Sequence, residues 1–175
     1  MKKNHLILSL LLPLFFIAAC SDPKPISYTS LTGGFAVVVP APLEESELNN
    51  GDSVVHIFKL ENNGYYYGVS YIEFPKETIL PSNIENKFDG ARDGALRNNQ
   101  GKLISEEKIL FDGYPGRMVV IGFNQSDSDM IMISKYFVIS NRLYIILGIS
   151  KSNKDNTLVI EKFINSFKLT NLKKT

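Results

Sequence analysis

The alternation of apolar and polar residues predicts a protein built mainly from β-strands. Short runs rich in β-branched and aromatic residues are bounded by Gly, Pro and Asn, which is typical of strands separated by turns. We expect strands over 35–39, 53–60, 66–74, 102–111, 117–123, 130–139, 143–149 and, briefly, 166–169. Most links between them have hairpin length, which makes neighbouring strands antiparallel.

The spacing of apolar residues becomes helical over 82–99. Ser82 and Glu85 have the spacing of a capping box, and Gly101 is positioned to end the helix. Gly90 and Gly94 are small enough for the helix to lie close to a sheet. The apolar face of this helix consists of Ile84, Phe88, Ala91 and Ala95.

A second amphipathic helix is expected over 156–166, with Asp155 or Asn156 as its N-cap. The strands over 130–139 and 143–149 are apolar on both faces, so each face needs a covering layer. The two helices and a long loop over 40–52 are the available covers. We therefore predict an α+β fold, an α/β/α sandwich with an antiparallel sheet of about six to seven strands.

The first residues have the organisation of a secretory signal. Lys2 and Lys3 precede an apolar stretch over 6–19 that ends at Cys20. This stretch is shorter than the roughly 20 residues that a membrane-spanning helix needs.

The sequence Ile17-Ala18-Ala19-Cys20 resembles the signal peptides of bacterial lipoproteins. The resemblance implies cleavage before Cys20 and attachment of lipid to its sulfur, and several acyl chains would hold the domain firmly on a membrane. Ser21, rather than Asp, follows the cysteine, which by the same analogy favours the outer membrane, facing the periplasm, in a Gram-negative cell.

The chain then divides into four parts. Residues 1–19 form the signal peptide, and 20–33 are expected to form a lipidated, flexible tether because prolines and hydroxyl residues dominate there. Residues 34–170 form one domain, and 171–175 form a C-terminal tail.

Composition restricts the function. The chain has 19 Lys and Arg against 18 Asp and Glu, which argues against a nucleic-acid partner because such binding needs a basic patch. A single cysteine excludes an intrachain disulfide.

Catalytic patterns are missing from the sequence. Gly68-Val-Ser70 and Gly148-Ile-Ser150 lack the last glycine of a nucleophile elbow, and no phosphate-binding loop occurs. His56 is the one histidine after the signal peptide, and we expect it to be partly buried or at a sheet edge. The sequence thus predicts neither an enzyme nor a cofactor.

Three surface features are weak candidates for binding. Asp127 and Asp129 are a possible cation site, but we interpret them as a soluble turn, because the further oxygen ligands of a calcium loop do not follow them. Helix 82–99 carries an acidic stripe, which we interpret as a solvated face neutralised by Arg92 and Arg97, with an acidic contact surface as the alternative. The stripe consists of Glu85, Asp89 and Asp93.

The third candidate is Tyr65-Tyr66-Tyr67, which follows the hairpin turn at Asn62-Asn63-Gly64. Alternation sends Tyr66 to one face of the strand and Tyr65 and Tyr67 to the other. We interpret these tyrosines as packing across strands with their hydroxyls in water, and a partner contact near the loop tip is the alternative.

Several local sequences, in their order and spacing, resemble the PsbP-like fold, which occurs in a photosystem II subunit, a yeast Ran-binding protein and small DcrB-like bacterial lipoproteins. The resemblance implies an adaptor or accessory role without catalysis, and no site residue carries over from it. The matching sequences are Gly34-Phe35 with Val37 and Val39-Pro40, Leu110 to Gly116, Arg142-Leu-Tyr-Ile145, and Phe163 to Leu169.

The sequence therefore predicts a non-catalytic, lipid-anchored envelope protein that acts as an adaptor or accessory subunit through protein contacts. The alternative is a lipid-anchored binder of a small molecule or cation, with a pocket between loop 40–52 and the sheet. A hydrolase is a distant third, disfavoured by the single histidine of the mature chain.

Overall fold

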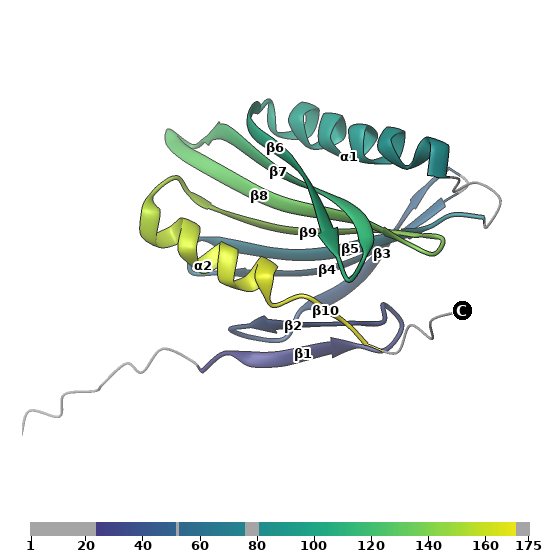
Figure 1. Ribbon diagram of the computed structural model, residues 1–175. Helices are drawn as coiled ribbons and strands as arrows, with labels where there is room; N and C mark the ends of the chain where they lie inside the picture. The colour runs from purple at the N-terminus through teal and green to yellow at the C-terminus, as the bar shows by residue number, and fades with distance from the viewer. Residues whose placement is uncertain (1–23, 52, 76–80, 171–175) are drawn as a thin grey trace, which may run out of the picture.

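The computed structural model describes residues 24–51, 53–75 and 81–170, and its main element is a seven-stranded antiparallel sheet with a helix on each face (Figure 1). The strand order is β3-β4-β5-β9-β8-β7-β6. This architecture confirms the expected sandwich. The strands are β3 Glu44–Asn50, β4 Ser53–Asn62, β5 Tyr65–Glu73, β6 Lys102–Phe111, β7 Tyr114–Gln125, β8 Ser128–Ile139 and β9 Arg142–Lys151.

A second, three-stranded sheet lies beyond α2, in the order β1-β2-β10 (Figure 1). Its strands are β1 Ile26–Ser30, β2 Phe35–Val39 and β10 Lys168–Leu169. The expectation of a flexible tether over 20–33 is wrong for residues 26–30, because Ile26 pairs with Val39 and Ser30 with Phe35. Pairing with the apolar strand β2, which follows after a link of four residues, explains this difference, because backbone hydrogen bonds to a partner strand do not depend on the polar composition of residues 26–30.

The expected loop over 40–52 is also wrong, because residues 44–50 form the edge strand β3, antiparallel to β4. Its sequence EESELNN lacks an apolar alternation, and charged residues are typical of exposed sheet edges. Since residues 44–50 are a strand of the sheet, the pocket predicted between a loop and the sheet loses the loop that was to form its wall.

The hairpin turns are tighter than expected. Asp112-Gly113 and Ser126-Asp127 adopt positive φ and connect their strands directly. The links 112–116 and 124–129 between the expected strands therefore shorten to two residues each, and their other residues belong to β7 and β8.

Helix α1 (Ile84–Asn99) follows a short 3-10 turn, η2 (Pro81–Asn83). Asn83, not Ser82, occupies the N-cap position, and the Glu85 carboxylate contacts Arg117 and Lys108 instead of closing a capping box. At the other end the left-handed residue is Gln100, with φ of 49°, rather than Gly101.

The glycines of α1 also behave differently from the prediction. A Cβ atom at Gly90 would have no neighbour within 4 Å, and one at Gly94 would reach only the Arg97 side chain, at 4.0 Å. These glycines therefore do not serve close packing on the sheet. Gly101 does, because its Cβ would lie 2.5 Å from Ile121 Cγ2.

Helix α2 (Lys154–Asn165) begins earlier than expected. Its N-cap is Asn153, whose side chain accepts a hydrogen bond from the Asn156 backbone N–H at 2.9 Å. The predicted caps, Asp155 and Asn156, lie inside the first turn.

The sheet face beneath α2 holds an aromatic core, which also includes the small sheet. The Phe35 ring lies 5.0 Å from Phe58 and 5.8 Å from Phe167, and Tyr144 lies 5.9 Å from Phe167. A Cβ atom at Gly116 would approach Phe137 Cδ1 to 2.4 Å. The four sequences that carry the family resemblance thus converge on one cluster and build the fold.

The opposite face is only partly covered. Helix α1 packs Phe88, Ala91 and Ala95 against β7 and β8, as its apolar spacing predicted. Among the described residues, no helix packs over the half of this face that β3, β4 and β5 provide (Figure 1).

Candidate functional site

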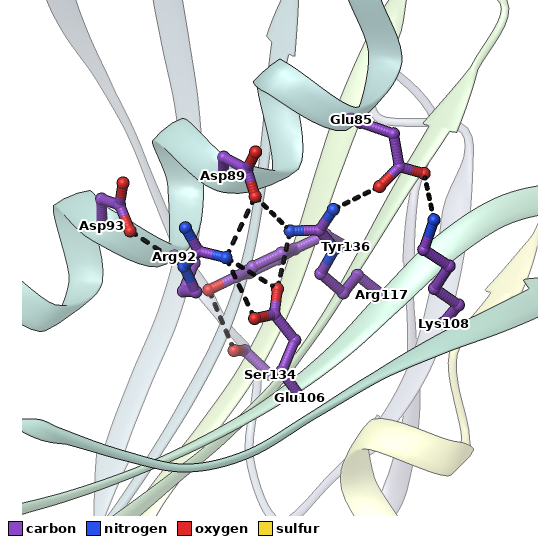
Figure 2. A network of polar contacts seen from close by, with 9 residues as sticks. All are labelled: Glu85, Asp89, Arg92, Asp93, Glu106, Lys108, Arg117, Ser134 and Tyr136. Atoms are coloured by element: carbon purple, nitrogen blue, oxygen red, sulfur yellow. Dashed lines mark hydrogen bonds and ion pairs between the residues drawn. The ribbon is translucent and has the colours of Figure 1, made fainter.

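A cluster of charged side chains joins α1 to the sheet (Figure 2). Arg117, on β7, has a side chain that is only 7% exposed. Its Nη1 atom donates hydrogen bonds to Asp89 at 2.5 Å and Glu106 at 2.6 Å, and its Nη2 atom donates to Glu85. One guanidinium group therefore holds two residues of the helix and one of β6.

Arg92 extends this cluster, contacting Asp89 and Glu106 at 3.0 Å and Asp93 at 2.8 Å. Hydrogen bonds from Arg117 lower the pKa values of Glu85 and Asp89, although desolvation opposes the change. Each charged side chain in this cluster lies beside one of opposite charge. The cluster therefore acts as a structural clamp that holds α1 on the sheet.

The acidic stripe is therefore not simply a solvated face, because Glu85 and Asp89 point to the sheet (Figure 2). Arg92 has the expected neutralising role. Arg117 was missed, although strand alternation places it on the same face as Val119 and Ile121, where a charged side chain requires a partner.

The three tyrosines separate as alternation predicted. Tyr67 is 4% exposed and packs edge-on against Phe163 at 5.2 Å, so it is not available to a partner. The Tyr65 hydroxyl donates to Asn156 Oδ1 at 2.8 Å. Tyr66 lies on the opposite face of β5, and burial and the nearby Glu61 raise the pKa of its hydroxyl.

A broad groove of about 1290 Å³ lies where α1 ends above the sheet. It runs between the β4–β5 hairpin, the end of α1 and the β7–β8 hairpin. The groove is lined by residues from two different candidates of the sequence analysis. They are Tyr65 and Tyr66 from the tyrosine run and Asp129 from the possible cation site. The other lining residues include Glu61, Lys102, Phe123, Met130, Ile149 and Ser152, together with Asn62, Asn63, Asn98, Asn99, Gln100, Asn124 and Gln125.

The other candidates do not form a catalytic or metal site. His56 stacks on Tyr71 at 4.4 Å and its Nδ1 lies 3.0 Å from Glu47, so it is partly buried in a structural position. Asp127 is a turn residue with φ of 60°. In the described part of the chain, no three His, Cys, Asp or Glu side chains gather closely enough to hold a metal ion.

Cys20 and the signal sequence lie outside the described residues. Within the described ranges, neither helix has the length and apolar character needed to cross a membrane.

No protein-family model and no curated protein sequence matches the chain. Solved structures nevertheless share its fold. The solution structure of PsbP from the cyanobacterium Synechocystis sp. PCC 6803 has 14% sequence identity and a TM-score of 0.59, and the match covers 90% of this chain and 99% of that chain. The PsbP-like fold predicted from the local sequences is thereby confirmed.

Two further structures match with lower scores. A Pseudomonas aeruginosa protein of unknown function has 13% identity and a TM-score of 0.43 over 78% of this chain and 88% of its own. A Bacteroides thetaiotaomicron protein has 9% identity and a TM-score of 0.45 over 85% of this chain and 49% of its own. At these scores, neither structure adds to the fold assignment.

Proposed function

We propose that this protein is a non-catalytic, lipid-anchored accessory protein of the cell envelope that binds a partner protein. The observation that carries this proposal is an apolar surface on the uncovered half of the α1 face. We name it the open face, and it consists of Leu48, Val55, Ile57 and Ile72, with Ile145 of β9 at its border with the hydrophobic cluster under α1.

The strand register makes these residues contiguous. Leu48 lies opposite Val55, which lies opposite Ile72, so they form one row across β3, β4 and β5. Ile57 and Ile145 lie in the next row, on either side of Ser70. Leu48 is 57% exposed and the others are half-buried. A contiguous apolar surface that stays partly exposed, with Leu48 accessible at its edge, is characteristic of an interaction site.

The charges beside the open face balance one another. Glu44 on β3 lies opposite Lys59 on β4, on the same face as Leu48 and Ile57, whereas Glu45 and Glu47 point to the other face, where they contact Tyr28 and His56. The apolar residues therefore define the expected partner, which should present a complementary apolar patch.

The proposed lipid anchor places this interaction near a membrane. If Cys20 carries the lipid, six residue steps separate it from Ile26, where β1 begins. A fully extended chain of that length spans about 20 Å. The domain would therefore meet partners close to the membrane surface.

Photo-crosslinking in cells tests the proposal directly. A photoreactive amino acid at position 48 should capture one protein, whereas the same amino acid at position 158 should not. Leu158 is a suitable control because it is an exposed leucine, 44% accessible, on α2. Capture should be lost when Cys20→Ala removes the anchor.

The affinity of the captured protein should then be measured with purified components. Leu48→Lys should weaken binding about tenfold or more, since it replaces an apolar contact of the site by a charge. Leu158→Lys should leave the affinity unchanged. Equal capture at both positions, or equal affinity of both variants, would contradict a partner site on the open face.

A further inference from the structure

The groove at the end of α1 is distinct from the open face in its chemistry. Its floor comes from side chains on four neighbouring strands: Tyr66 on β5, Ile149 on β9, Met130 on β8 and Phe123 on β7. Tyr66 lies opposite Ile149, and Phe123 lies opposite Met130. The floor is therefore apolar and partly aromatic.

The ring of Tyr66 lies along the sheet instead of projecting from it. A Cβ atom at Gly68, two residues further along the same face, would be 2.7 Å from Tyr66 Cε1. The absence of a side chain at Gly68 therefore makes room for the ring to lie flat along the strand. A ring in this orientation offers one face to the groove as a flat platform.

The rim of the groove is rich in side-chain amides. Each amide provides both donors and an acceptor, which matches hydroxyl groups that also donate and accept. Of the seven amides, only Asn99 has a side-chain hydrogen bond among the described residues, to the Ala95 carbonyl oxygen at 2.8 Å. The amides are Asn62, Asn63, Asn98, Asn99, Gln100, Asn124 and Gln125.

Charge and topology restrict the ligand further. Glu61 and Asp129 outnumber Lys102 among the charged lining residues, which disfavours a polyanion. An extended peptide normally binds by hydrogen bonds to a free sheet edge. The floor is the face of interior strands, whose backbones already pair with neighbours on both sides.

We propose that the groove binds an uncharged oligosaccharide, with Tyr66 stacking against a sugar ring and the rim amides binding its hydroxyl groups. The volume of about 1290 Å³ exceeds the roughly 300 to 1,000 Å³ of pockets for drug-sized ligands. The groove therefore has room for a chain of several sugar rings. This site is independent of the proposed protein partner, because it uses other residues of the α1 face.

The test measures binding of the full-length chain, held in detergent micelles, to defined oligosaccharides by titration calorimetry. The probes are neutral cello-, malto- and chito-oligosaccharides of increasing length, with heparin and an unrelated peptide as comparisons. We expect at least one neutral series to bind, with an affinity that rises with chain length. Binding of heparin or the peptide alone, or no binding at millimolar concentrations, would overturn the proposal.

Variants locate the binding site. Tyr66→Ala should weaken binding about tenfold, whereas Tyr66→Phe, which keeps the ring, should remain within about twofold. Asn124→Asp should also weaken binding because it removes a donor and adds a negative charge. Asn49→Asp is the matched control, since Asn49 is exposed on β3, outside the groove. Unchanged affinity in Tyr66→Ala would place the sugar elsewhere and overturn the assignment.

The experiments distinguish failure of the protein-partner proposal from failure of the oligosaccharide proposal. Loss of crosslinking at position 48 with intact oligosaccharide binding would remove only the protein partner. Loss of oligosaccharide binding with intact crosslinking would remove only the groove ligand.

Discussion

The two faces of the large sheet are stabilised by different interactions. Beneath α2, rings from the large sheet, the small sheet and the chain after α2 pack together, and Phe35, Tyr144 and Ile160 are fully buried. Beneath α1, the apolar contacts are joined by the Arg117 cluster, and half of the face has no helical cover among the described residues. One face thus consolidates the fold, while the other retains surfaces that a ligand or partner can contact.

The difference has an energetic basis. Apolar burial is not directional and scales with area, so the α2 face gains by covering as much surface as possible. Hydrogen bonds between a guanidinium and carboxylates depend on geometry. Arg117 therefore fixes where α1 lies on β7 and β8, and that position leaves the groove open beyond the end of the helix.

The largest effect is expected from removing a ring on the α2 face. Phe35→Ala should lower the free energy of unfolding by about 3 to 5 kcal/mol, because a cavity replaces a fully buried side chain. Urea unfolding followed by circular dichroism measures this loss. Val38→Ala, in the same strand at a position 45% exposed, should cost less than about 1 kcal/mol. If Phe35→Ala and Val38→Ala lowered the free energy of unfolding by similar amounts, the ring of Phe35 would have no particular role in the core.

A smaller effect is expected from breaking the clamp on the α1 face. Arg117→Met leaves Glu85, Asp89 and Glu106 without their shared partner. The cost should be about 2 kcal/mol, below the roughly 3 to 5 kcal/mol of a fully buried pair, because the carboxylates are partly exposed.

Hydrogen exchange locates the effect of that substitution. Amides of α1 should exchange faster in Arg117→Met, while those of α2 should keep their protection. Arg97→Met, which changes an exposed residue of α1, is the control. Uniform loss of protection across both helices would contradict a local clamp.

The smallest effect is a pH dependence confined to the same face. The pKa values of Glu85 and Asp89 are lower in the folded state than in the unfolded state, so their stabilising contribution is present above roughly pH 4 and decreases as the pH falls through the folded values. The unfolding free energy should therefore fall more steeply with acidification in the unmodified protein than in Arg117→Met. Parallel curves for the two proteins would exclude this linkage.

The sequence was sufficient for elements whose pattern reflects burial on both faces. The strands over 130–139 and 143–149 became β8 and β9 near the centre of the sheet, and the spacing of Ile84, Phe88 and Ala91 identified the buried side of α1. The local sequences of the PsbP-like resemblance identified the fold because they form its aromatic core.

The sequence was insufficient where a strand is built mainly from polar residues. Strands β1 and β3 lack the β-branched and apolar runs that identified the other strands, and their extended conformation comes from hairpin pairing with β2 and β4. Asn153 was missed as the cap of α2 because helix boundaries depend on one or two local hydrogen bonds.

The sequence by itself determined the α+β class, the order of most elements and the residue types available for binding, and it carries the signal from which lipid attachment at Cys20 is expected. Only the tertiary structure decided which of those residues meet. It placed Arg117 among carboxylates from α1 and β6, buried Tyr67, and brought Tyr66 together with amides from three separate segments. The physical reason is that hydrophobic periodicity records which side of an element is buried, whereas a site depends on how separate elements pack against one another.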